Sequence, residues 1–270
     1  MISFPNAKIN IGLNITGKRP DGYHNLETIF FPVGWSDALE IAFSDELAFS
    51  ASGIEISGPP KSNLVIKAYQ LLANEYSLPP LRIHLHKQIP FGAGLGGGSA
   101  DGAFMLMMLD KAFKLDIQKD KMVEYAARLG SDCPFFVLNR PTFATGRGEV
   151  MNPINLSLKG LSLFMVKPNV EVSTAAAFKN IVPQEPKVSL QKLISLPVPE
   201  WKKHIFNQFE LSVFQQFPEI EAVKNQLYSL GAIYASMSGS GSCVFGLFVD
   251  LPDEIEGCFP SSYKIFRQNL

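Results

Sequence analysis

The residues whose types and spacing point most clearly to chemistry lie in a glycine-rich stretch near the middle of the chain. Residues 90–102 read PFGAGLGGGSADG, and the apolar run FMLMML follows closely. A glycine inside a regular element costs about 0.5–1 kcal/mol relative to alanine. Because so many glycines stand immediately before a predicted helix, some requirement other than stability must keep them there.

A flexible linker and a dinucleotide site are two of the three interpretations of this stretch. A linker is disfavoured because linkers seldom lead directly into a helix whose first turn could use their exposed backbone groups. The spacing from Gly92 to Gly97 fits G-x-G-x-x-G, but a lone match is weak. The preceding segment 81–87, LRIHLHK, alternates apolar and polar residues. A Rossmann first strand is covered on both faces and reads as a continuous apolar run, so the alternation favours an open antiparallel sheet instead.

The third interpretation is a cradle for the phosphates of a nucleotide in phosphoryl transfer. Gly92 and Gly97, followed by Gly98 and Ser99, resemble a P-loop in which glycine replaces the lysine. Successive backbone N–H groups form a concave donor nest, and the N-terminus of the following helix adds about half a positive charge. Only glycine lets the backbone approach phosphates this closely. Ser99 either offers its hydroxyl to a phosphate or Mg²⁺, or serves as the helix N-cap.

The elements that must position this stretch are a mixture of strands and helices. Hydrophobic periodicity predicts strands over residues 7–15, 23–31, 81–87, 135–138, 161–166 and 243–249, with further strands between 39 and 56. It predicts helices over 63–75, 99–115, 119–129, 206–214 and 220–230. Glycine turns are expected at 145–149 and 238–242, and a proline-rich connection at 183–199. The strand over 7–15 should be half-buried, with Lys8 and Asn10 on its polar face.

This irregular order of strands and helices favours an α+β fold over a doubly wound sheet. The sequence pattern changes beyond about residue 153, where a buried strand over 161–166 is followed by the proline-rich connection. We therefore predict two domains, an N-terminal domain over residues 1–155 that contains the glycine-rich stretch and a C-terminal α+β domain over residues 156–270.

The composition excludes several classes of protein. The 270 residues carry 24 Lys and Arg against 25 Asp and Glu, a net charge of −1, so no global field attracts nucleic acid or an anionic membrane. The 3 cysteines form no C-x-x-C pair, which argues for a reducing compartment and against a disulfide framework or a zinc site. No segment reads as a signal peptide or a membrane span. We predict a soluble, cytoplasmic protein.

Three separated segments resemble one superfamily of small-molecule kinases. They read NAKINIGLNITGKRPDGYHNLET from residue 6, PFGAGLGGGSADG from residue 90 and SMSGSGSCVF from residue 236. These segments are similar to the signature motifs of the superfamily that includes galactokinase, homoserine kinase and mevalonate kinase. Within it, KINIGLNITGKRPDGYH and GSDCPFF most closely resemble the 4-diphosphocytidyl-2-C-methyl-D-erythritol kinases of the non-mevalonate isoprenoid pathway.

The resemblance implies a two-domain α+β fold with the active site in the cleft between the domains. It implies ATP and Mg²⁺, and transfer of the γ-phosphoryl group to the 2-hydroxyl of the methylerythritol moiety of a cytidine diphosphate substrate. No side chain is assigned as a metal ligand. The implied partner is a small molecule rather than nucleic acid or a membrane, and the expected state is a monomer or weak homodimer.

The same resemblance implies roles for particular residues. Lys8 and Asp132 are the implied catalytic pair. The implied ATP-phosphate site consists of Pro90, Phe91, Gly92, Ala93, Gly94, Leu95, Gly96, Gly97, Gly98, Ser99 and Ala100. The implied substrate contacts are Asn10, Tyr23, His24, Phe30, Thr174, Phe178, Gly239, Ser240 and Gly241. The last three form a glycine turn that supports either the phosphate loop or the phosphates of the acceptor.

Several alternatives stay open at this point. Asp132 by its position alone would be a turn former, Lys8 a strand-edge lysine, and Phe30 and Phe178 plain core residues. Arg147 is better explained as the exposed arginine of a tight hairpin than as a phosphate ligand. Ala100 and Ala175 replace a serine and a proline that are frequent in the family, which leaves the ligation of Mg²⁺ open.

Three other functions compete with this one. A homoserine or mevalonate kinase would use an acceptor that lacks a base. A non-catalytic ATP-binding sensor would keep the fold without the chemistry, although the presence of both Lys8 and Asp132 speaks against it. A nicotinamide-dependent dehydrogenase is the most distant of the three.

Overall fold

The computed structural model describes residues 1–179 and 181–270. The chain forms two compact units that are interleaved along the sequence. Unit 1 contains residues 1–7, 34–90 and 96–140, and unit 2 contains residues 8–33, 91–95 and 141–270. Both units combine helices with sheets, which confirms the predicted α+β class. The predicted domain division at residue 155 stays a prediction.

Unit 1 is built on a sheet of four strands in the order β1-β4-β6-β5. These strands are β1 (Ile2–Ser3), β4 (Ala38–Phe43), β5 (Ala48–Gly53) and β6 (Leu81–Lys87). Strand β6 buries Leu81, Ile83 and Leu85 and exposes Arg82, so the predicted alternation is confirmed. The expected antiparallel sheet is wrong in one respect, because β6 pairs antiparallel with β4 but parallel with β5. The pair is parallel because a helix, Leu64–Tyr76, lies between β5 and β6 in the chain. This crossover connection returns the chain to the end of the sheet where β5 began.

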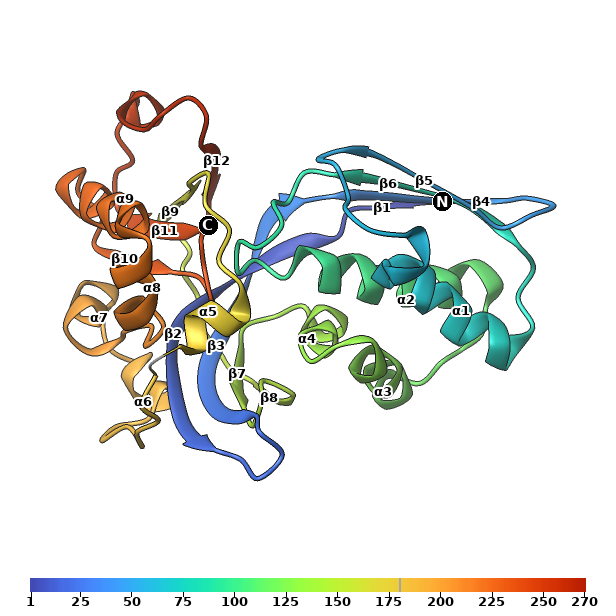
Figure 1. The fold of residues 1–270 in the computed structure, drawn as a ribbon, viewed down its shortest axis with the longest axis horizontal. Helices are drawn as coiled ribbons and strands as arrows, with labels where there is room; N and C mark the ends of the chain where they lie inside the picture. The colour runs from blue at the N-terminus through green and yellow to red at the C-terminus, as the bar shows by residue number, and fades with distance from the viewer. Residues whose placement is uncertain (180) are drawn as a thin grey trace. The chain divides into compact units, whose positions relative to one another are not determined.

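The helices of unit 1 lie along one side of this sheet (Figure 1). They are α1 (Leu64–Tyr76), α2 (Gly97–Phe113), α3 (Lys119–Leu129), α4 (Cys133–Leu138) and the short 3₁₀ helix η1 (Pro60–Ser62). Asn63 caps α1, since its side chain accepts a hydrogen bond from the N–H of Val65 at 2.9 Å. Helix α2 begins at Gly97, two residues before its predicted start, and its N-cap is Gly96 in the left-handed region at φ 70°.

The predicted strand over residues 135–138 is wrong, because these residues belong to helix α4. Pro134 lies in the first turn of α4, where its missing N–H costs no hydrogen bond. Phe135 and Phe136 are both fully buried. A buried apolar run this short has no periodicity that separates a strand from a helix.

A buried cluster of one lysine and two aspartates lies beneath the start of α2. The Lys87 ammonium, 1% exposed, pairs with the carboxylates of Asp37 and Asp101. The contact with Asp101 is 2.9 Å long. Asp37 also accepts hydrogen bonds from the backbone N–H groups of Gln88 and Ile89. The second oxygen of Asp101, Oδ1, is buried without a hydrogen-bond partner. Burial raises the pKa of Asp101 to about 7, and the Lys87 ammonium only partly offsets this rise.

Unit 2 contains two sheets of four strands each. The first has the order β2-β3-β7-β8 and comprises β2 (Asn6–Lys18), β3 (His24–Ser36), β7 (Thr142–Thr145) and β8 (Val150–Pro153). The second has the order β10-β11-β9-β12 and comprises β9 (Ser162–Lys167), β10 (Tyr234–Met237), β11 (Val244–Phe248) and β12 (Lys264–Asn269). All pairs in the second sheet are antiparallel.

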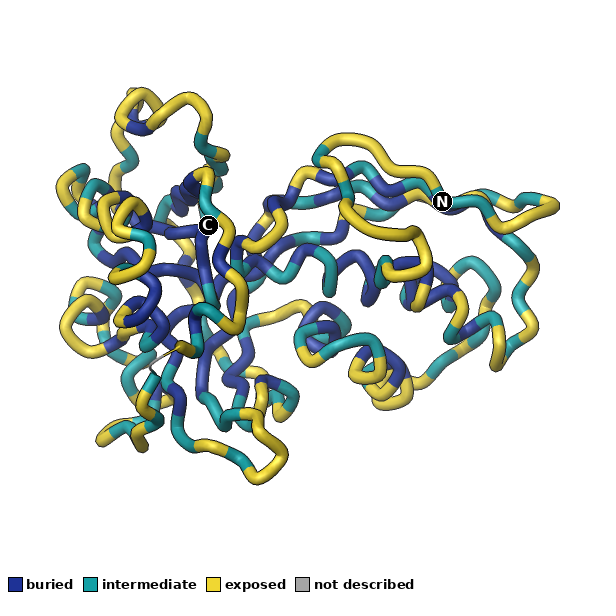
Figure 2. The backbone as a smooth tube through the Cα atoms, viewed as in Figure 1, coloured by how far each residue is buried: buried dark blue, intermediate teal, exposed yellow. Residues whose placement is uncertain are grey.

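The core of unit 2 forms between the second sheet and the helices that connect its strands along the chain. These helices are α5 (Thr174–Phe178), α6 (Leu190–Leu193), α7 (Val198–His204), α8 (Glu210–Gln216), α9 (Pro218–Ser229) and the 3₁₀ helix η2 (Ile255–Cys258). Helix α9 packs on β10 and β11 through Val223 and Leu227. Figure 2 shows β10 and β11 dark blue along their length, since every residue of both strands is buried. Within the described residues, no helix has the length and apolar character that a membrane span requires.

The Lys87 cluster makes stability depend on pH. In the native state Asp101 holds a proton up to about pH 7, whereas in the unfolded chain it loses the proton near pH 4. Between these values the native state binds more protons, so the contribution of Asp101 to stability falls as pH rises and levels off above pH 7. We expect Asp101→Asn to remove this trend: the stability of wild type relative to the variant should decrease from pH 5 to pH 8 in urea unfolding.

Asp110→Asn is the matched control, because Asp110 lies on the same helix and accepts a hydrogen bond from the N–H of Ile117 at 3.0 Å, outside the cluster. Parallel pH profiles for wild type and Asp101→Asn would contradict the assignment.

Candidate active site

Strand β2 carries the first two predicted site residues, and both are buried. Lys8 is 4% and Asn10 2% exposed, so the predicted strand and its polar face are confirmed, but the expectation that only half of the strand is buried is wrong. The face is polar because its side chains have partners inside unit 2. The Lys8 ammonium donates to Asn10 Oδ1 at 2.5 Å and to the carbonyl oxygen of Gly94 at 2.9 Å. Asn10 Nδ2 in turn donates to the hydroxyl of Thr28 at 2.9 Å.

The first part of the glycine stretch and the distant glycine turn form one hydrogen-bonded assembly in unit 2. The Ser238 hydroxyl donates to the Gly94 carbonyl at 2.8 Å and accepts from the N–H of Asn10 at 3.2 Å. Backbone N–H groups of Ser242 and Cys243 donate to the carbonyls of Gly92 and Ala93 at 3.0 and 3.2 Å. Segments about 150 residues apart thus share one site. These contacts bring together the predicted residues Lys8, Asn10 and Gly92–Gly94, and the predicted turn Gly239–Gly241 lies between Ser238 and Ser242 of the same assembly.

Gly94 is the position where this assembly requires glycine. Its φ is +71°, and a Cβ built there would lie 1.9 Å from the carbonyl oxygen of Ser238. No side chain can occupy that space without moving the turn. The close approach of two backbone segments therefore explains one glycine of the stretch without any ligand.

The rest of the stretch belongs to unit 1, where it lies near Asp132. Pro90 and Gly96–Ala100 are in this unit. Ser99 lies close to the thiol of Cys133, the residue next to Asp132. Burial raises the pKa of that thiol to about 12, so it is not a nucleophile at neutral pH. Asp132 is half-buried at the N-terminus of α4, and its side chain does not cap the helix.

Gly97 and Gly98, in the first turn of α2, differ in what surrounds them. A Cβ on Gly97 would lie 2.8 Å from Ile89 and 2.9 Å from the Lys87 ammonium, so packing explains this glycine. A Cβ on Gly98 would meet nothing within 4 Å. Gly98 also lacks the positive φ that favours glycine. Neither packing nor backbone conformation within the protein explains Gly98, and open space at a helix N-terminus suits an anionic ligand.

The predicted aromatic contacts all belong to unit 2, and two of them are in contact with each other. The rings of His24 and Phe178 stack with centroids 4.7 Å apart, and Phe178 meets Phe209 edge-on at 4.8 Å. Tyr23 is 58% exposed, and the guanidinium of Arg147 lies 5.1 Å from the centre of its ring. The Lys8 ammonium lies 5.1 Å from the centre of the Phe30 ring.

The two remaining predictions for this region concern Thr174 and Arg147. Thr174 is the exposed first residue of α5, whose N-cap Ser173 accepts from the N–H of Ala176 at 3.1 Å. Arg147 lies in the turn between β7 and β8 with its side chain 41% exposed, which agrees with the hairpin interpretation.

Sequence interpretation missed two groups of polar residues around these segments. One is the buried Lys87 cluster beneath α2, and the other is the pair Asn207 and Glu210 behind the glycine turn. The available signal was a polar residue within an apolar run, as in FNQFE at residues 206–210. Ser99 is not the N-cap of α2, because Gly96 holds that position.

Comparison with known proteins identifies the family to which this chain is similar. The profile for the GHMP kinases N terminal domain matches residues 63–140, and that for GHMP kinases C terminal matches residues 191–264. The 4-diphosphocytidyl-2-C-methyl-D-erythritol kinase of Bacteroides fragilis is 59% identical over 252 residues, 92% of each chain. The protein of that name from Bacteroides thetaiotaomicron is 55% identical and covers 97% of this chain and 95% of its own. The chain belongs to the GHMP kinase family.

Solved structures agree with this kinase assignment. A crystal structure of 4-(cytidine 5'-diphospho)-2C-methyl-D-erythritol kinase superposes with a TM-score of 0.83 at 29% identity, covering 99% of this chain and 98% of that one. The mevalonate kinase of Methanococcus jannaschii superposes with a TM-score of 0.70 at 14% identity, covering 99% and 97%. At that identity the second likeness shows the fold alone. The predicted kinase fold and the predicted enzyme class are confirmed, and ATP is the substrate that a GHMP kinase implies.

The Gly94 contact gives a direct test of the assembly in unit 2. We expect Gly94→Ala to lower the free energy of unfolding by more than about 2 kcal/mol, because strain at positive φ adds to overlap with the Ser238 carbonyl. Gly160→Ala is the control: its φ is +89°, but its Cβ would meet nothing within 4 Å, so only the φ strain of about 1–2 kcal/mol applies. Equal losses in denaturant unfolding would show that Gly94 and Ser238 are not in contact.

Proposed function

We propose that this kinase transfers the γ-phosphoryl group of ATP to the 2-hydroxyl of 4-diphosphocytidyl-2-C-methyl-D-erythritol. The observation that carries the proposal is full-length similarity, since relatives at 45–59% identity along at least 92% of the chain bear the name of that kinase. Contacts between some of the residues that the resemblance singled out also support the proposal: Lys8 donates to the Gly94 carbonyl in unit 2, and Ser99 lies close to the neighbour of Asp132 in unit 1.

Phosphoryl transfer depends mainly on positioning and on balancing charge. In the proposed mechanism, the stretch from Pro90 to Ala100 binds the ATP phosphates through the backbone N–H groups of the residues that follow Pro90. Asp132 orients the acceptor hydroxyl and accepts its proton as the oxygen attacks the γ-phosphorus. The Lys8 ammonium, held by Gly94 and Asn10, stabilises negative charge on the transferred group.

The aromatic residues of unit 2 are proposed to select the cytidine end of the acceptor. Tyr23, Phe30 and Phe178 supply faces for stacking, which contributes about 1–3 kcal/mol per base. His24 is proposed as a hydrogen-bond partner for the edge of the cytosine. Its ring stacks on Phe178 in this structure, so the two predicted contacts for the base are neighbours before it binds. Thr174 and the turn Gly239–Gly241, including Ser240, complete the proposed acceptor site.

Mg²⁺ belongs to the proposal as a companion of ATP. Within residues 1–179 and 181–270, no group of three or more His, Cys, Asp or Glu side chains is placed to hold a metal ion. Mg²⁺ commonly keeps several water ligands and is bound through substrate phosphates together with one or two protein ligands. The Ser99 hydroxyl in the first turn of α2 is the proposed protein donor. When bound, the ion neutralises phosphate charge.

The cellular setting is also proposed rather than observed. We place the enzyme in the cytoplasm as a monomer or weak homodimer. The free cysteines Cys133, Cys243 and Cys258 support a reducing compartment.

Transfer of ³²P from [γ-³²P]ATP to the cytidine diphosphate alcohol tests the proposed function. We expect wild type to label this acceptor and not homoserine or mevalonate. Asp132→Asn should lower kcat by about 10²–10⁴, the contribution of a positioned acid–base group, while ATP still binds. Ser131→Ala at the exposed neighbouring residue should keep wild-type turnover. ATP binding by wild type without labelled product would favour the sensor instead.

Gly98 provides a separate test of the phosphate cradle. We expect Gly98→Ala to stabilise the fold by about 0.5–1 kcal/mol, because alanine favours a helix and the position is open. The same methyl group should raise the KM for ATP at least about 10-fold, with the KM for the acceptor unchanged. Gly257→Ala, at an equally open position in η2, should leave both KM values unchanged. A more stable Gly98→Ala enzyme with the wild-type KM for ATP would refute the cradle.

A further inference from the structure

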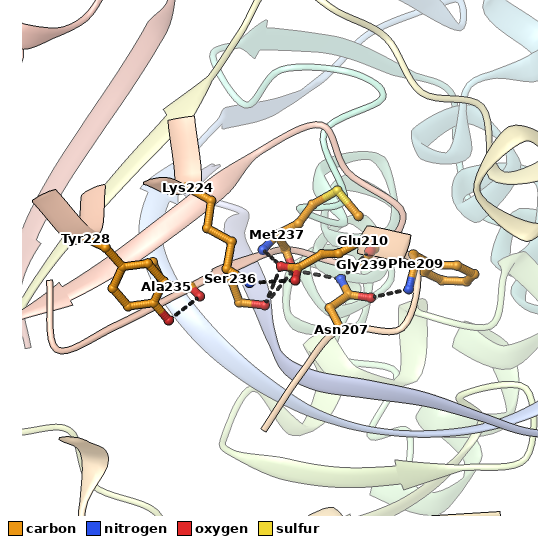
Figure 3. Close-up of polar contacts among 9 residues, drawn as sticks. All are labelled: Asn207, Phe209, Glu210, Lys224, Tyr228, Ala235, Ser236, Met237 and Gly239. Atoms are coloured by element: carbon orange, nitrogen blue, oxygen red, sulfur yellow. Dashed lines mark hydrogen bonds and ion pairs between the residues drawn. The ribbon is translucent and has the colours of Figure 1, made fainter. Parts of the chain in front are cut away.

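Two buried polar side chains of unit 2 form hydrogen bonds with the backbone at the start of the glycine turn, residues 238–242. Asn207 is 1% and Glu210 7% exposed. Figure 3 shows both side chains directed at the end of strand β10, where the turn begins. The resemblance assigned a role to neither residue.

Asn207 uses both ends of its amide in this contact. Its Nδ2 donates to the carbonyl of Met237 at 2.8 Å and to that of Gly239 at 2.7 Å. Its Oδ1 accepts from the N–H of Phe209 at 3.0 Å. The amide can face only one way, since the reverse orientation would point an oxygen at two carbonyls. Backbone hydrogen bonds on either side of Asn207 also tie its segment to Leu13 of β2.

Glu210 fixes the neighbouring groups of the same strand. Its Oε1 accepts from the N–H of Met237 at 2.8 Å and from the hydroxyl of Ser236 at 3.2 Å. Its Oε2 pairs with the ammonium of Lys224 from α9 at 2.6 Å. Side chains therefore hold both the N–H and the carbonyl of Met237, the last residue of β10. The ion pair with Lys224 offsets the cost of burying the Glu210 carboxylate.

The turn held in this way supports the proposed catalytic lysine. Ser238, between Met237 and Gly239, donates to the same Gly94 carbonyl that accepts from Lys8. A Cβ on Gly239 would lie 3.2 Å from Asn10 Oδ1, which also accepts from Lys8. The Gly94 carbonyl and Asn10 Oδ1 thus both lie against the turn.

We propose that Asn207 is a positioning residue for phosphoryl transfer, acting through the Gly239 carbonyl and the turn to fix the Lys8 ammonium. This inference rests on the proposed function, in which Lys8 stabilises charge on the transferred group. A displacement of about 1 Å in such a group can cost about 100-fold in rate. Asn207 itself touches neither substrate nor Lys8.

Asn207→Asp tests this role with little change in shape. The introduced carboxylate can still accept from the N–H of Phe209, but it donates nothing to Met237 or Gly239 and places negative charge against their carbonyls. We expect kcat at pH 8 to fall about 10–100-fold, with the KM values for ATP and acceptor changed by less than about 3-fold. Protonation of the introduced carboxyl restores one donor, so kcat relative to wild type should rise as pH is lowered to 6.

Tyr228→Phe is the matched control from the same cluster (Figure 3). It removes the hydrogen bond from the Tyr228 hydroxyl to the carbonyl of Ala235 on β10, 3.1 Å long and two residues before Met237. It should lower the melting temperature and leave kcat unchanged when every enzyme is assayed well below its own melting temperature. Wild-type kcat in Asn207→Asp, or an equal kcat loss in both variants, would overturn the inference. Absence of ³²P transfer by wild type would instead overturn the proposed function.

Discussion

The site in unit 2 depends on one backbone carbonyl, that of Gly94, which accepts hydrogen bonds from both the Lys8 ammonium and the Ser238 hydroxyl. A buried ammonium must be compensated by acceptors, since the cost of burying a charge far exceeds that of a neutral polar group. A carbonyl supplies an acceptor for the ammonium without adding a formal charge. This arrangement links three segments of the chain through one acceptor: strand β2 with Lys8, the glycine-rich stretch with Gly94, and the turn that begins at Ser238.

The glycines of the stretch at residues 90–102 are present for different physical reasons. Gly94 is required because two backbone segments approach each other closely, and Gly97 because Ile89 and Lys87 occupy the space that a Cβ would need. Gly98 has open space around it and ordinary backbone angles. The number of glycines in the stretch therefore overstates how many serve a ligand. Only the glycines that the protein's own packing leaves unexplained bear on phosphate binding, and Gly98 is one of them.

Much of the fold followed from local patterns, and the failures have physical causes. Alternation in LRIHLHK and the span of Lys119–Leu129 predicted a strand and a helix that the structure confirms. Periodicity could not show that the polar face of β2 is buried, because the partners of Lys8 and Asn10 come from segments far along the chain. Asn207 was missed for the same reason. Its amide donates to the carbonyls of Met237 and Gly239, about 30 residues further along the chain, and the local sequence does not predict these contacts.

The balance of charge in this protein is local rather than global. A net charge of −1 over 270 residues gives no general attraction for an anionic substrate. In unit 1 a single ammonium, Lys87, faces two carboxylates beneath the first turn of α2, and burial raises the pKa of Asp101 to about 7. With the proton retained the cluster is neutral, and the helix N-terminus keeps the partial positive charge of its N–H groups. Without the proton, a buried negative charge would oppose an anion at that end. Such a proton can reside on Oδ1 of Asp101, which has no hydrogen-bond partner. The burial that destabilises the ionised aspartate therefore also preserves the positive electrostatic potential at the start of α2.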